Sequence, residues 1–282
     1  MEVKKNKLYL YTLITVLSFT LFLGQASATE YINYYDISMT SEQYNNLLEL
    51  GFSENEIYYM DEETFETNKD ISAELVAKNN KYYKTVYTDL NGNSYSVEVN
   101  KDEYNNQSTM DPRGTINTEY KNVISTMSKL TNTFRYKVTV GWNRMPSTRS
   151  YDIIGIGFDD DVYISSSVYF TYTYCVSSGD CTTSTLYYDR KKLSTGGSVV
   201  YKVPSQTINS LSAVLYYDVA KNTTSTINNL YMCGDYSHAT STVTSEQYTN
   251  YTINRYGLIL YDNVPNYYDA IPCADSTWGG SW

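Results

Sequence analysis

The stretch from Phe134 to Phe158, FRYKVTVGWNRMPSTRSYDIIGIGF, constrains most strongly what this chain can fold into. Apolar and polar side chains alternate in its first half. The apolar face would hold Phe134, Tyr136, Val138, Val140 and Trp142, and the polar face Arg135, Lys137 and Thr139. A period of two is typical of a strand with one buried and one solvent-exposed face. The stretch predicts two strands joined by a tight connection. This pattern indicates the fold and gives no information about chemical activity.

The second half of this stretch places glycines opposite its apolar residues. Ile154, Ile156 and Phe158 share one side, and Gly155 and Gly157 lie on the other. Glycines at alternate strand positions indicate a bulge or the close approach of another backbone. The sequence leaves both possibilities open.

Further short strands follow, separated by Gly, Pro and Asn. They are predicted at Tyr120–Ser128, Phe134–Trp142, Tyr151–Phe158, Val168–Val176, Thr183–Tyr188, Val199–Val203, Ser212–Val219, Asn229–Met232 and Tyr256–Tyr261. This spacing is typical of an antiparallel β-sandwich, and we expect a jelly-roll-like one. The absence of a long amphipathic helix among them disfavours a parallel α/β fold.

A small helical segment and a hairpin are predicted before the sandwich. Ser41 begins a helix that ends at Gly51, Ser53 and Glu56 form a capping box for a second, and Asp61 caps a third. Asn91-Gly92-Asn93 lies between alternating stretches at Tyr82–Leu90 and Tyr95–Val99, which predicts a β-hairpin.

The distribution of charge also separates the helical segment and hairpin from the predicted sandwich. Residues 29–111 hold seventeen acidic and five basic side chains, whereas residues 112–282 hold thirteen of each. Proline and glycine punctuate the sequence at Asp111-Pro112-Arg113-Gly114, so we place a boundary there between an acidic helical segment with a hairpin, 29–111, and the sandwich, 112–282. An acidic chain with no basic stripe is a poor candidate for binding nucleic acid or an anionic membrane.

Residues 1–28 have the pattern of a secretory signal peptide. Lys4, Lys5 and Lys7 precede an apolar run from Leu8 to Gly24, and Ala26-Ser27-Ala28 is a small-residue cleavage site. The alternative is an uncleaved membrane anchor, but the apolar run is short for a membrane span and contains Tyr, Thr and Ser. We expect cleavage after Ala28 and a secreted, extracellular protein.

The cysteines are Cys175, Cys181, Cys233 and Cys273, all within the predicted sandwich. An even number in an exported chain favours disulfides. Three pairings are open. We prefer Cys175–Cys181, because the intervening SSGD consists of residues that are common in turns. Cys233–Cys273 would then tie the C-terminal tail to the sheet. A zinc site lacks the paired short spacings and the extra histidine that it needs.

Two motifs carry a resemblance. WNRMPSTRSYDIIGIGF, from Trp142 to Phe158, and GDYSHAT, from Gly234 to Thr240, resemble those of exported β-rich proteins of Gram-positive, AT-rich bacteria that have no assigned activity. The turn LGFSENEI is similar to segments of the same kind of protein. The resemblance spans most of the mature chain, implies export and a sheet domain, and brings no catalytic residue with it.

The chain has a single histidine, His238, in the polar motif GDYSHAT. A catalytic triad would need a nucleophile and an orienting acid beside it, and Asp235, Ser237 and Ser241 are near in sequence. Residues so close along a strand or turn rarely form a triad, and no glycine-flanked serine elbow is present. We therefore expect an ordered polar loop, no catalytic residue and no cofactor.

Carboxylates offer two further hypotheses. Asp159, Asp160 and Asp161 follow the central strand and could bind calcium with Asp189 or Asp262, although a solvated turn is the common case. A glycosidase needs two carboxylates facing each other across a cleft. The sequence supplies candidates in number only, namely Asp152, Asp218, Asp235 and Asp262.

Aromatic residues suggest binding instead of catalysis. Tyrosine is frequent, with 33 residues, which fits strand propensity as well as a surface that holds sugars or proteins. Of the tryptophans, Trp142 follows the core pattern, while Trp278 and Trp282 lie in a Gly/Ser-rich tail. The sequence favours a non-enzymatic extracellular protein that binds a polysaccharide or a cell-surface protein. A carboxylate-dependent glycan hydrolase is the alternative.

Overall fold

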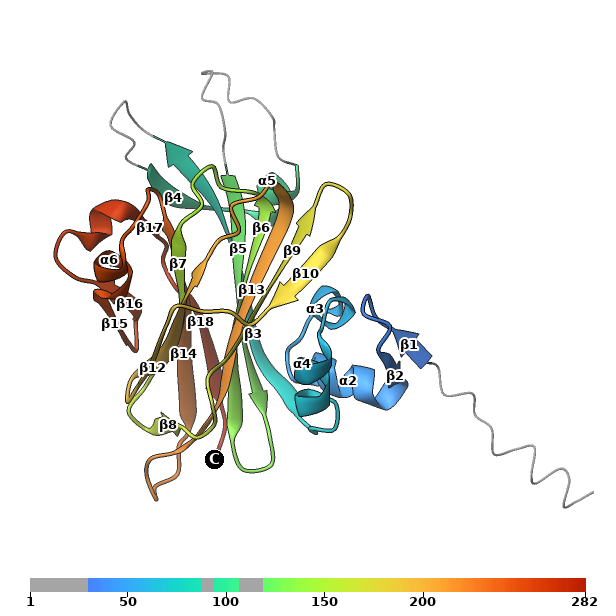
Figure 1. Cartoon of the computed structure of the whole chain (residues 1–282). Helices are drawn as coiled ribbons and strands as arrows, with labels where there is room; N and C mark the ends of the chain where they lie inside the picture. The colour runs from blue at the N-terminus through green and yellow to red at the C-terminus, as the bar shows by residue number, and fades with distance from the viewer. Residues whose placement is uncertain (1–29, 88–93, 107–118) are drawn as a thin grey trace, which may run out of the picture.

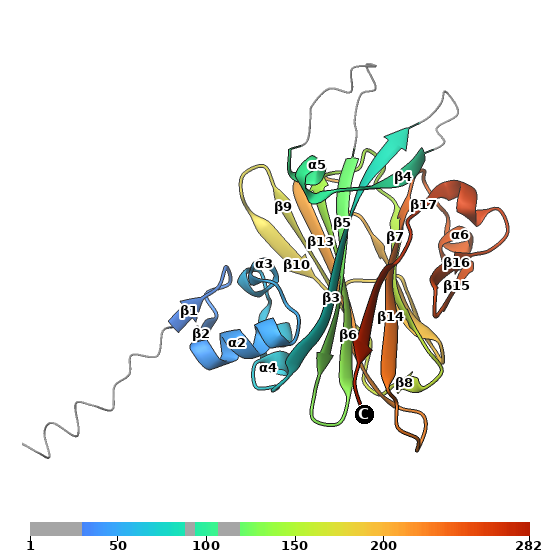
Figure 2. The ribbon, with the colours of Figure 1, turned by 180° about the vertical axis from the view of Figure 1, so that it is seen from behind.

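The computed structural model describes residues 30–87, 94–106 and 119–282. Two antiparallel sheets pack face to face, and a small cover lies on the outer face of each (Figure 1, Figure 2). Helices of the N-terminal segment cover the larger sheet, and a hairpin with a short helix from the C-terminal part covers the smaller one. The predicted mainly β, antiparallel sandwich is confirmed.

The larger sheet has eight strands in the order β10-β9-β13-β6-β5-β3-β4, with β8 also paired to β13. Its strands are β3 (Glu74–Tyr87), β4 (Ser94–Val99), β5 (Glu119–Lys129), β6 (Phe134–Arg144), β8 (Val162–Ile164), β9 (Tyr169–Val176), β10 (Cys181–Ser184) and β13 (Ile208–Lys221). The predicted hairpin β3–β4 is confirmed as an antiparallel pair, and β3 also pairs with β5, so the hairpin extends this sheet.

The smaller sheet has six strands in the order β11-β12-β7-β14-β17, with β18 also paired to β14. Its strands are β7 (Tyr151–Phe158), β11 (Asp189–Leu193), β12 (Gly196–Lys202), β14 (Asn229–Ala239), β17 (Tyr268–Ala270) and β18 (Ala274–Gly279). Two separate hairpins complete the strands, β1 (Glu30–Ile32) with β2 (Ser38–Thr40) and β15 (Tyr251–Asn254) with β16 (Gly257–Leu260).

The two strands predicted in the Phe134–Phe158 stretch are β6 and β7, and they belong to different sheets. The short connection at 145–150 therefore carries the chain across the sandwich. The apolar side chains of both strands, such as Val138, Val140 and Ile154, are fully buried in the core between the sheets. This alternation is what makes the stretch the centre of the fold.

The opposite face of β6 was predicted to be solvent-exposed, and this prediction is wrong. Arg135, Lys137 and Thr139 are only 2%, 1% and 6% exposed. Helices cover them, and their polar partners come from both the helices and the sheet. Lys137 pairs with Glu56 of a covering helix at 2.9 Å, and Arg135 pairs with Asp218 of the neighbouring strand β13 at 2.8 Å. Burying charged groups requires such partners, and sequence alternation alone does not reveal them.

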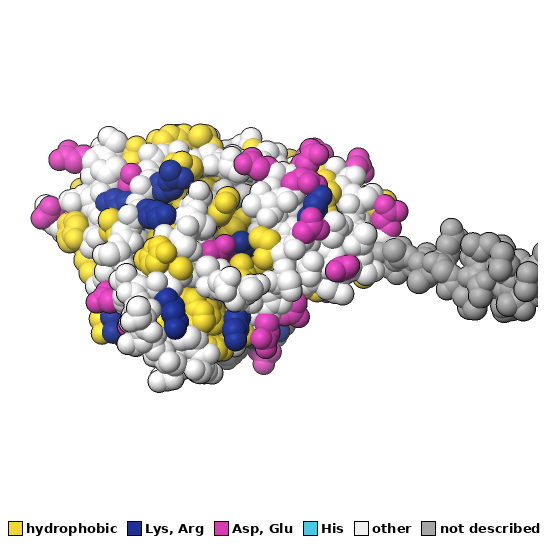
Figure 3. All heavy atoms as spheres, turned by 90° about the horizontal axis from the view of Figure 1, so that it is seen from below, with side chains coloured by type: hydrophobic (Ala, Val, Ile, Leu, Met, Phe, Trp, Pro, Cys, Tyr) yellow, Lys and Arg dark blue, Asp and Glu magenta, His cyan; other side chains and the backbone are white. Residues whose placement is uncertain are grey.

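The covering helices are those predicted. They are α2 (Ser41–Glu49), α3 (Glu54–Tyr58) and α4 (Glu62–Asn68), and Ser53 with Glu56 forms the capping box of α3. Gly51 has φ 87°, the left-handed conformation expected after α2. Apolar residues of these helices pack on Val214 and Tyr216 of β13. Acidic side chains are spread over this part of the surface, at the right of Figure 3.

Further helical turns were not predicted. They are α5 (Lys101–Asn105) beside β3, α6 (Ser245–Thr249) near β7, and the 3-10 turn η1 (Val264–Tyr267). Each is four or five residues long, so its stability comes from packing on the sheets.

The β1–β2 hairpin protects one edge of the larger sheet. Tyr34 and Tyr35 lie in its turn, and their hydroxyl oxygens accept hydrogen bonds from the backbone N–H groups of Cys181 (3.1 Å) and Thr183 (2.8 Å). These N–H groups belong to β10, the terminal strand of the sheet. The tyrosines thus occupy donors that an edge strand would otherwise leave open.

Of the two possibilities left open for the β7 glycines, the structure shows the close approach of another backbone. A Cβ atom on Gly157 would lie 1.8 Å from the carbonyl oxygen of Asn254, the last residue of β15. One on Gly155 would lie 2.7 Å from a methyl group of Ile253. The hairpin therefore rests directly on the backbone of the smaller sheet, where only glycine leaves enough room.

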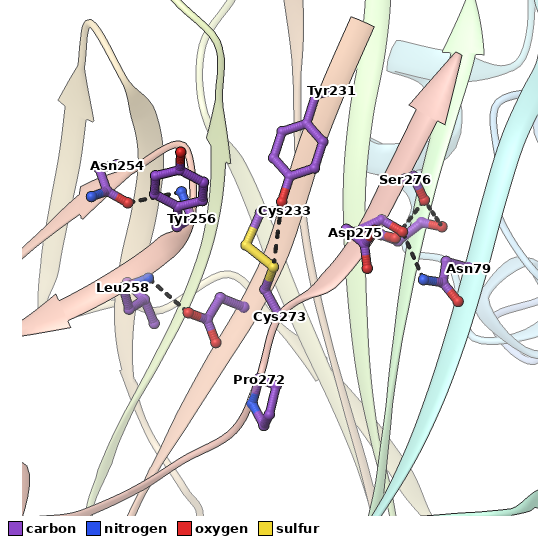
Figure 4. The surroundings of a disulfide bond; sticks show 12 residues. Asn79, Tyr231, Cys233, Asn254, Tyr256, Leu258, Pro272, Cys273, Asp275 and Ser276 are labelled. Atoms are coloured by element: carbon purple, nitrogen blue, oxygen red, sulfur yellow. Dashed lines mark hydrogen bonds between the residues drawn. A yellow bond between two sulfur atoms is a disulfide. The ribbon is translucent and has the colours of Figure 1, made fainter. Parts of the chain in front are cut away.

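Both preferred disulfides are present. Cys175–Cys181 joins β9 to β10, and Cys233–Cys273 ties β14 to the segment before β18. The hydroxyl group of Tyr231 lies 3.8 Å from the Cys273 sulfur (Figure 4). The turn at Asn91-Gly92-Asn93, the boundary at Asp111 and the signal peptide lie outside the described residues. Within those residues, no helix has the length and apolarity to cross a bilayer.

Candidate functional site

A groove of about 250 Å³ lies on the outer face of the larger sheet, beyond the part that α2–α4 cover. Its floor is a row of residues in register across four neighbouring strands. Asn122 of β5 is opposite Gly141 of β6, Gly141 is opposite Ser212 of β13, and Ser212 is opposite Thr173 of β9. Because residues directly opposite each other on paired strands point to the same side of the sheet, all four lie on one surface.

Two tyrosines border this groove from different helices. Tyr104 of α5 donates its hydroxyl hydrogen to Asn122 Oδ1 at 3.2 Å and packs on the ring of Tyr82, with the centroids 4.8 Å apart. Tyr59 follows α3 and packs against the rings of Tyr34 and Tyr58. The groove thus has an aromatic side chain on two of its sides.

Gly141 shapes the floor by lacking a side chain. A Cβ atom there would lie 2.5 Å from Asn122 Oδ1, so the Asn122 amide lies directly over the backbone of β6. This position lets the Asn122 side chain reach toward the middle of the groove. An alanine at Gly141 would displace it.

The lining of the groove is uncharged, and it combines polar side chains with apolar ones. Its described residues are Ser53, Asn55, Tyr59, Tyr104, Asn122, Ile124, Thr139, Gly141, Trp142, Asn143, Thr173, Cys175, Ser210, Leu211 and Ser212, and none of these is Asp, Glu, Lys, Arg or His. Burial raises the pKa of Tyr104 to about 12, so its hydroxyl group is neutral near pH 7. Amide and hydroxyl groups can both donate and accept hydrogen bonds.

Sequence reasoning did not identify these groove residues. The available signal was the polar character of alternate positions, Ser210 with Ser212 in β13 and Thr171 with Thr173 in β9. It could not be used, because the strands that meet here are up to about ninety residues apart and their register is not readable from one sequence.

The tryptophans do not form an exposed platform. Trp142 is 3% exposed, and its Nε1–H donates to the hydroxyl oxygen of Tyr236 at 3.0 Å, inside the sandwich. Trp278 and Trp282 are half-buried and both pack on Phe134, with ring centroids 4.9 and 4.8 Å away. The tail is therefore packed against the end of the core.

His238 is not in a polar loop, so that prediction is wrong. It lies in β14 between the sheets, and its Nδ1 is 3.0 Å from each carboxylate oxygen of Asp152 on β7. Asp235 and Ser237, the neighbours considered as partners, occupy alternate positions of β14 and so face away from it. The two side chains of the pair are 1% and 0% exposed, so a ligand could reach them only if the sandwich opened.

This pair belongs to a larger buried polar cluster. Asp152 also accepts hydrogen bonds from the Tyr236 hydroxyl group and from the backbone N–H of Ala239 (2.9 Å). Nearby, Lys121 pairs with Asp269 at 2.5 Å and lies over the Trp142 ring. The cluster links β5, β6, β7, β14 and β17, and thereby joins the two sheets.

The four aspartates considered for glycan hydrolysis do not converge. Asp152 lies between the sheets, Asp218 pairs with Arg135 on the outer face of the larger sheet, and Asp235 lies on the outer face of the smaller one. Asp262 is exposed after β16 and contacts Asn250. No two of them face each other across a cleft.

Asp159, Asp160 and Asp161 lie in the connection between β7 and β8, as expected. Asp159 pairs with Arg255 at 3.0 Å. Among the described residues, no group of three or more His, Cys, Asp or Glu side chains is arranged to hold a metal ion. The calcium hypothesis gains no support from this geometry.

The sequence matches no protein-family model and no curated protein sequence. Among solved structures, the collagen-binding domain of Erysipelothrix rhusiopathiae surface protein RspB aligns over 61% of this chain and 68% of its own, at 6% identity and TM-score 0.28. A pore-forming protein aligns over 75% and 93%, at 9% identity and TM-score 0.24. AvmM, a macrocyclization catalyst of alchivemycin A biosynthesis, aligns over 51% and 80%, at 13% identity and TM-score 0.23. TM-scores this low carry no argument about fold or function.

Proposed function

We propose that this protein is a non-catalytic extracellular binding protein, and that the groove on its larger sheet holds a neutral polysaccharide chain. The observation that carries the proposal is the lining of the groove, which is uncharged in a chain whose formal net charge is −10. Two disulfides support an oxidising compartment outside the cytosol.

The chemistry of the lining favours a hydroxyl-rich ligand. Asn122, Asn143 and Ser212 present groups that both donate and accept, as sugar hydroxyls do. A charged ligand would lose hydration without gaining an opposite charge, so the groove selects against ions. Tyr59 and Tyr104 add ring surfaces at its borders.

A peptide that adds a strand to the sheet fits this groove less well. Such a peptide needs an open sheet edge. The groove lies over β5, β6, β13 and β9, each of which is already paired on both sides. Recognition must therefore come from side chains rather than from backbone pairing.

Binding can be measured by calorimetry against neutral and uronic-acid-containing oligosaccharides. Asn143→Ala and Tyr104→Ala should each weaken binding of a neutral glycan at least about tenfold, since each removes a contact in the groove. Asn228→Ala is the matched control, because Asn228 is also exposed but does not line the groove. Unchanged melting temperatures would show that the variants are folded.

Two outcomes would overturn the proposal. One is the absence of binding to any neutral glycan, or equal binding by the groove variants and the wild type. The other is shortening of the glycan during incubation, seen by chromatography, which would favour the hydrolase alternative.

A further inference from the structure

The N-terminal lobe, defined as residues 30–73 with β1, β2 and α2–α4, has a very uneven charge. It contains eleven acidic side chains and one basic side chain, Lys69. Lys69 already pairs with Glu66 of the lobe. The acidic side chains in Figure 3 are spread over the lobe, while most of the Lys and Arg side chains in view lie over the sheets. The surface of the lobe therefore carries a negative potential.

A pocket of about 420 Å³ opens on this lobe, between the β1–β2 hairpin and helices α2 and α3. This volume is within the range of roughly 300–1,000 Å³ that is typical of ligand sites. Ile32 and Tyr58 in its lining are 61% and 47% exposed. Exposed apolar groups in one concave place are unusual on a surface without a partner. The lining also includes Tyr31, Met39, Tyr44, Glu54 and Ile57.

The pocket is held in shape by a buried amide. Asn33 Nδ2 donates to the carbonyl oxygen of Met60 at 2.7 Å, which ties the hairpin to the end of α3. Asn33 Oδ1 accepts from the N–H groups of Tyr35 (2.9 Å) and Ile37 (3.0 Å). A site that is already ordered loses little conformational entropy when a ligand binds.

The pocket combines apolar surface with features that attract cations. The rings of Tyr31 and Tyr44 stack at 4.2 Å between centroids, and aromatic faces attract Lys and Arg side chains. Glu54 contributes a carboxylate to the lining. Burial and the nearby Glu54 raise the pKa of Tyr44.

We propose that this pocket docks a basic, amphipathic segment of another polypeptide. An apolar side chain of the partner packs on Ile32 and Ile57, and its Lys or Arg side chains lie against Glu54 and the tyrosine rings. Charge complementarity selects this occupant. A second copy of the acidic lobe, an anionic membrane and a nucleic acid are all repelled. The proposal does not rest on the glycan groove, which has a different lining.

The test uses three synthetic peptides of one length in fluorescence anisotropy. The first has Leu residues spaced three or four apart, so that they form one face of a helix, and Lys residues on the opposite face. The second has Glu in place of Lys, and the third has Ser in place of Leu. Only the first should bind the wild-type protein well, because it alone supplies both apolar and basic groups. Added salt should weaken this binding, since part of the attraction is between exposed charges.

Matched variants locate the site. Glu54→Lys should weaken binding of the Leu/Lys peptide at least about tenfold more than Glu63→Lys, which makes the same charge change at an exposed site away from the pocket. Ile32→Ser should weaken it at least about fivefold without affecting folding, because Ile32 is largely exposed. Tyr58→Ala provides a second exposed site if Ile32→Ser does not fold.

Three outcomes would overturn the inference. Equal effects of Glu54→Lys and Glu63→Lys would indicate general electrostatic attraction only. Equal binding of the Lys and Glu peptides would remove the role of charge. Loss of peptide binding in Asn143→Ala, a variant of the glycan groove, would show that the peptide occupies that groove instead.

Discussion

Lys137 on β6 and Glu56 on α3 form an ion pair of 2.9 Å, with side chains that are 2% and 8% exposed. Glu56 also completes the capping box of α3 by accepting the N–H of Ser53. Burial alone would raise the pKa of Glu56, but Lys137 and the hydrogen bonds from Ser53 and Thr139 outweigh this effect and hold the pKa below its usual value. Glu56 thus stabilises the N-terminus of α3 and also holds this helix against the sheet.

Glu56→Gln should lower the free energy of unfolding by about 3 kcal/mol, because it leaves the Lys137 ammonium buried without its counter-ion. Glutamine retains the capping box, so the charge alone is tested. Urea denaturation measures the loss. Glu66→Gln removes the exposed partner of Lys69 and should cost less than about 1 kcal/mol. Similar losses in both variants would contradict the role given to the buried pair.

Asp235 should make stability fall as pH rises. Burial raises its pKa to about 7, although its carboxylate accepts hydrogen bonds from the N–H groups of Leu258 and Tyr236. Because the unfolded value is about 3.9, this contribution is fully present below about pH 4 and is lost as pH rises through 7. In the wild type the free energy of unfolding should fall by a few kcal/mol between about pH 4 and pH 7, and in Asp235→Asn this fall should be absent. Denaturation at several pH values measures it. Asp70→Asn, at an exposed aspartate, should leave the decrease intact.

The two disulfides should contribute unequally to stability. Cys233–Cys273 closes a loop with a sequence separation of 40, and Cys175–Cys181 one of 6. If a disulfide stabilises the fold by lowering the entropy of the unfolded chain, the longer loop contributes about 4 kcal/mol to the free energy of unfolding and the shorter loop about 2 kcal/mol. Replacing Cys233 and Cys273 by Ser should therefore lower the melting temperature more than replacing the other pair. Mass spectrometry of a non-reduced digest checks the pairing, and a peptide joining the two pairs would refute it.

His238→Asn should affect stability and leave function largely unchanged. The imidazole lies against Asp152 and edge-on to Trp142, with ring centroids 4.9 Å apart, so its loss should cost about 1–3 kcal/mol of unfolding free energy. Affinity for glycan, or any activity found, should change less than about tenfold, since the group is sealed between the sheets. A drop of about a thousandfold in an activity of folded protein would instead assign His238 a catalytic role.

Export can be tested directly. Protein recovered from culture medium should begin at Thr29, because Ala26-Ser27-Ala28 supplies the small residues that signal cleavage needs. Replacing Ala26 and Ala28 by Leu should block processing. Recovery of the wild-type chain with its first 28 residues intact in a membrane fraction would contradict the signal-peptide prediction.

Local patterns predicted much of the fold. Alternation located β5, β6 and β7, capping residues located α2 to α4, and turn chemistry between Cys175 and Cys181 gave the disulfide pairing. Strands without their own alternation were missed. The strand β11 reads DRKKL and exists because β12 pairs with it, and β17 has only three residues. Such strands depend on partners more than on propensity.

The site residues were harder to predict because they depend on distant contacts. The partner of His238 is Asp152, 86 residues earlier in the chain, whereas sequence proximity pointed to Asp235. The polar positions Asn122 and Ser212 become a groove only when β5, β6 and β13 are in register. No local pattern specifies that register.

The contacts of Tyr34 and Tyr35 with β10 link the processing of the chain to its aggregation. With cleavage after Ala28, both tyrosines remain and continue to cap the last strand of the larger sheet. Trimming beyond Asp36 would remove them and leave the N–H groups of Cys181 and Thr183 unpaired. Two trimmed molecules could then pair edge to edge through β10, and preparations nicked by a protease near the N-terminus should form dimers or larger associations while intact ones stay dispersed.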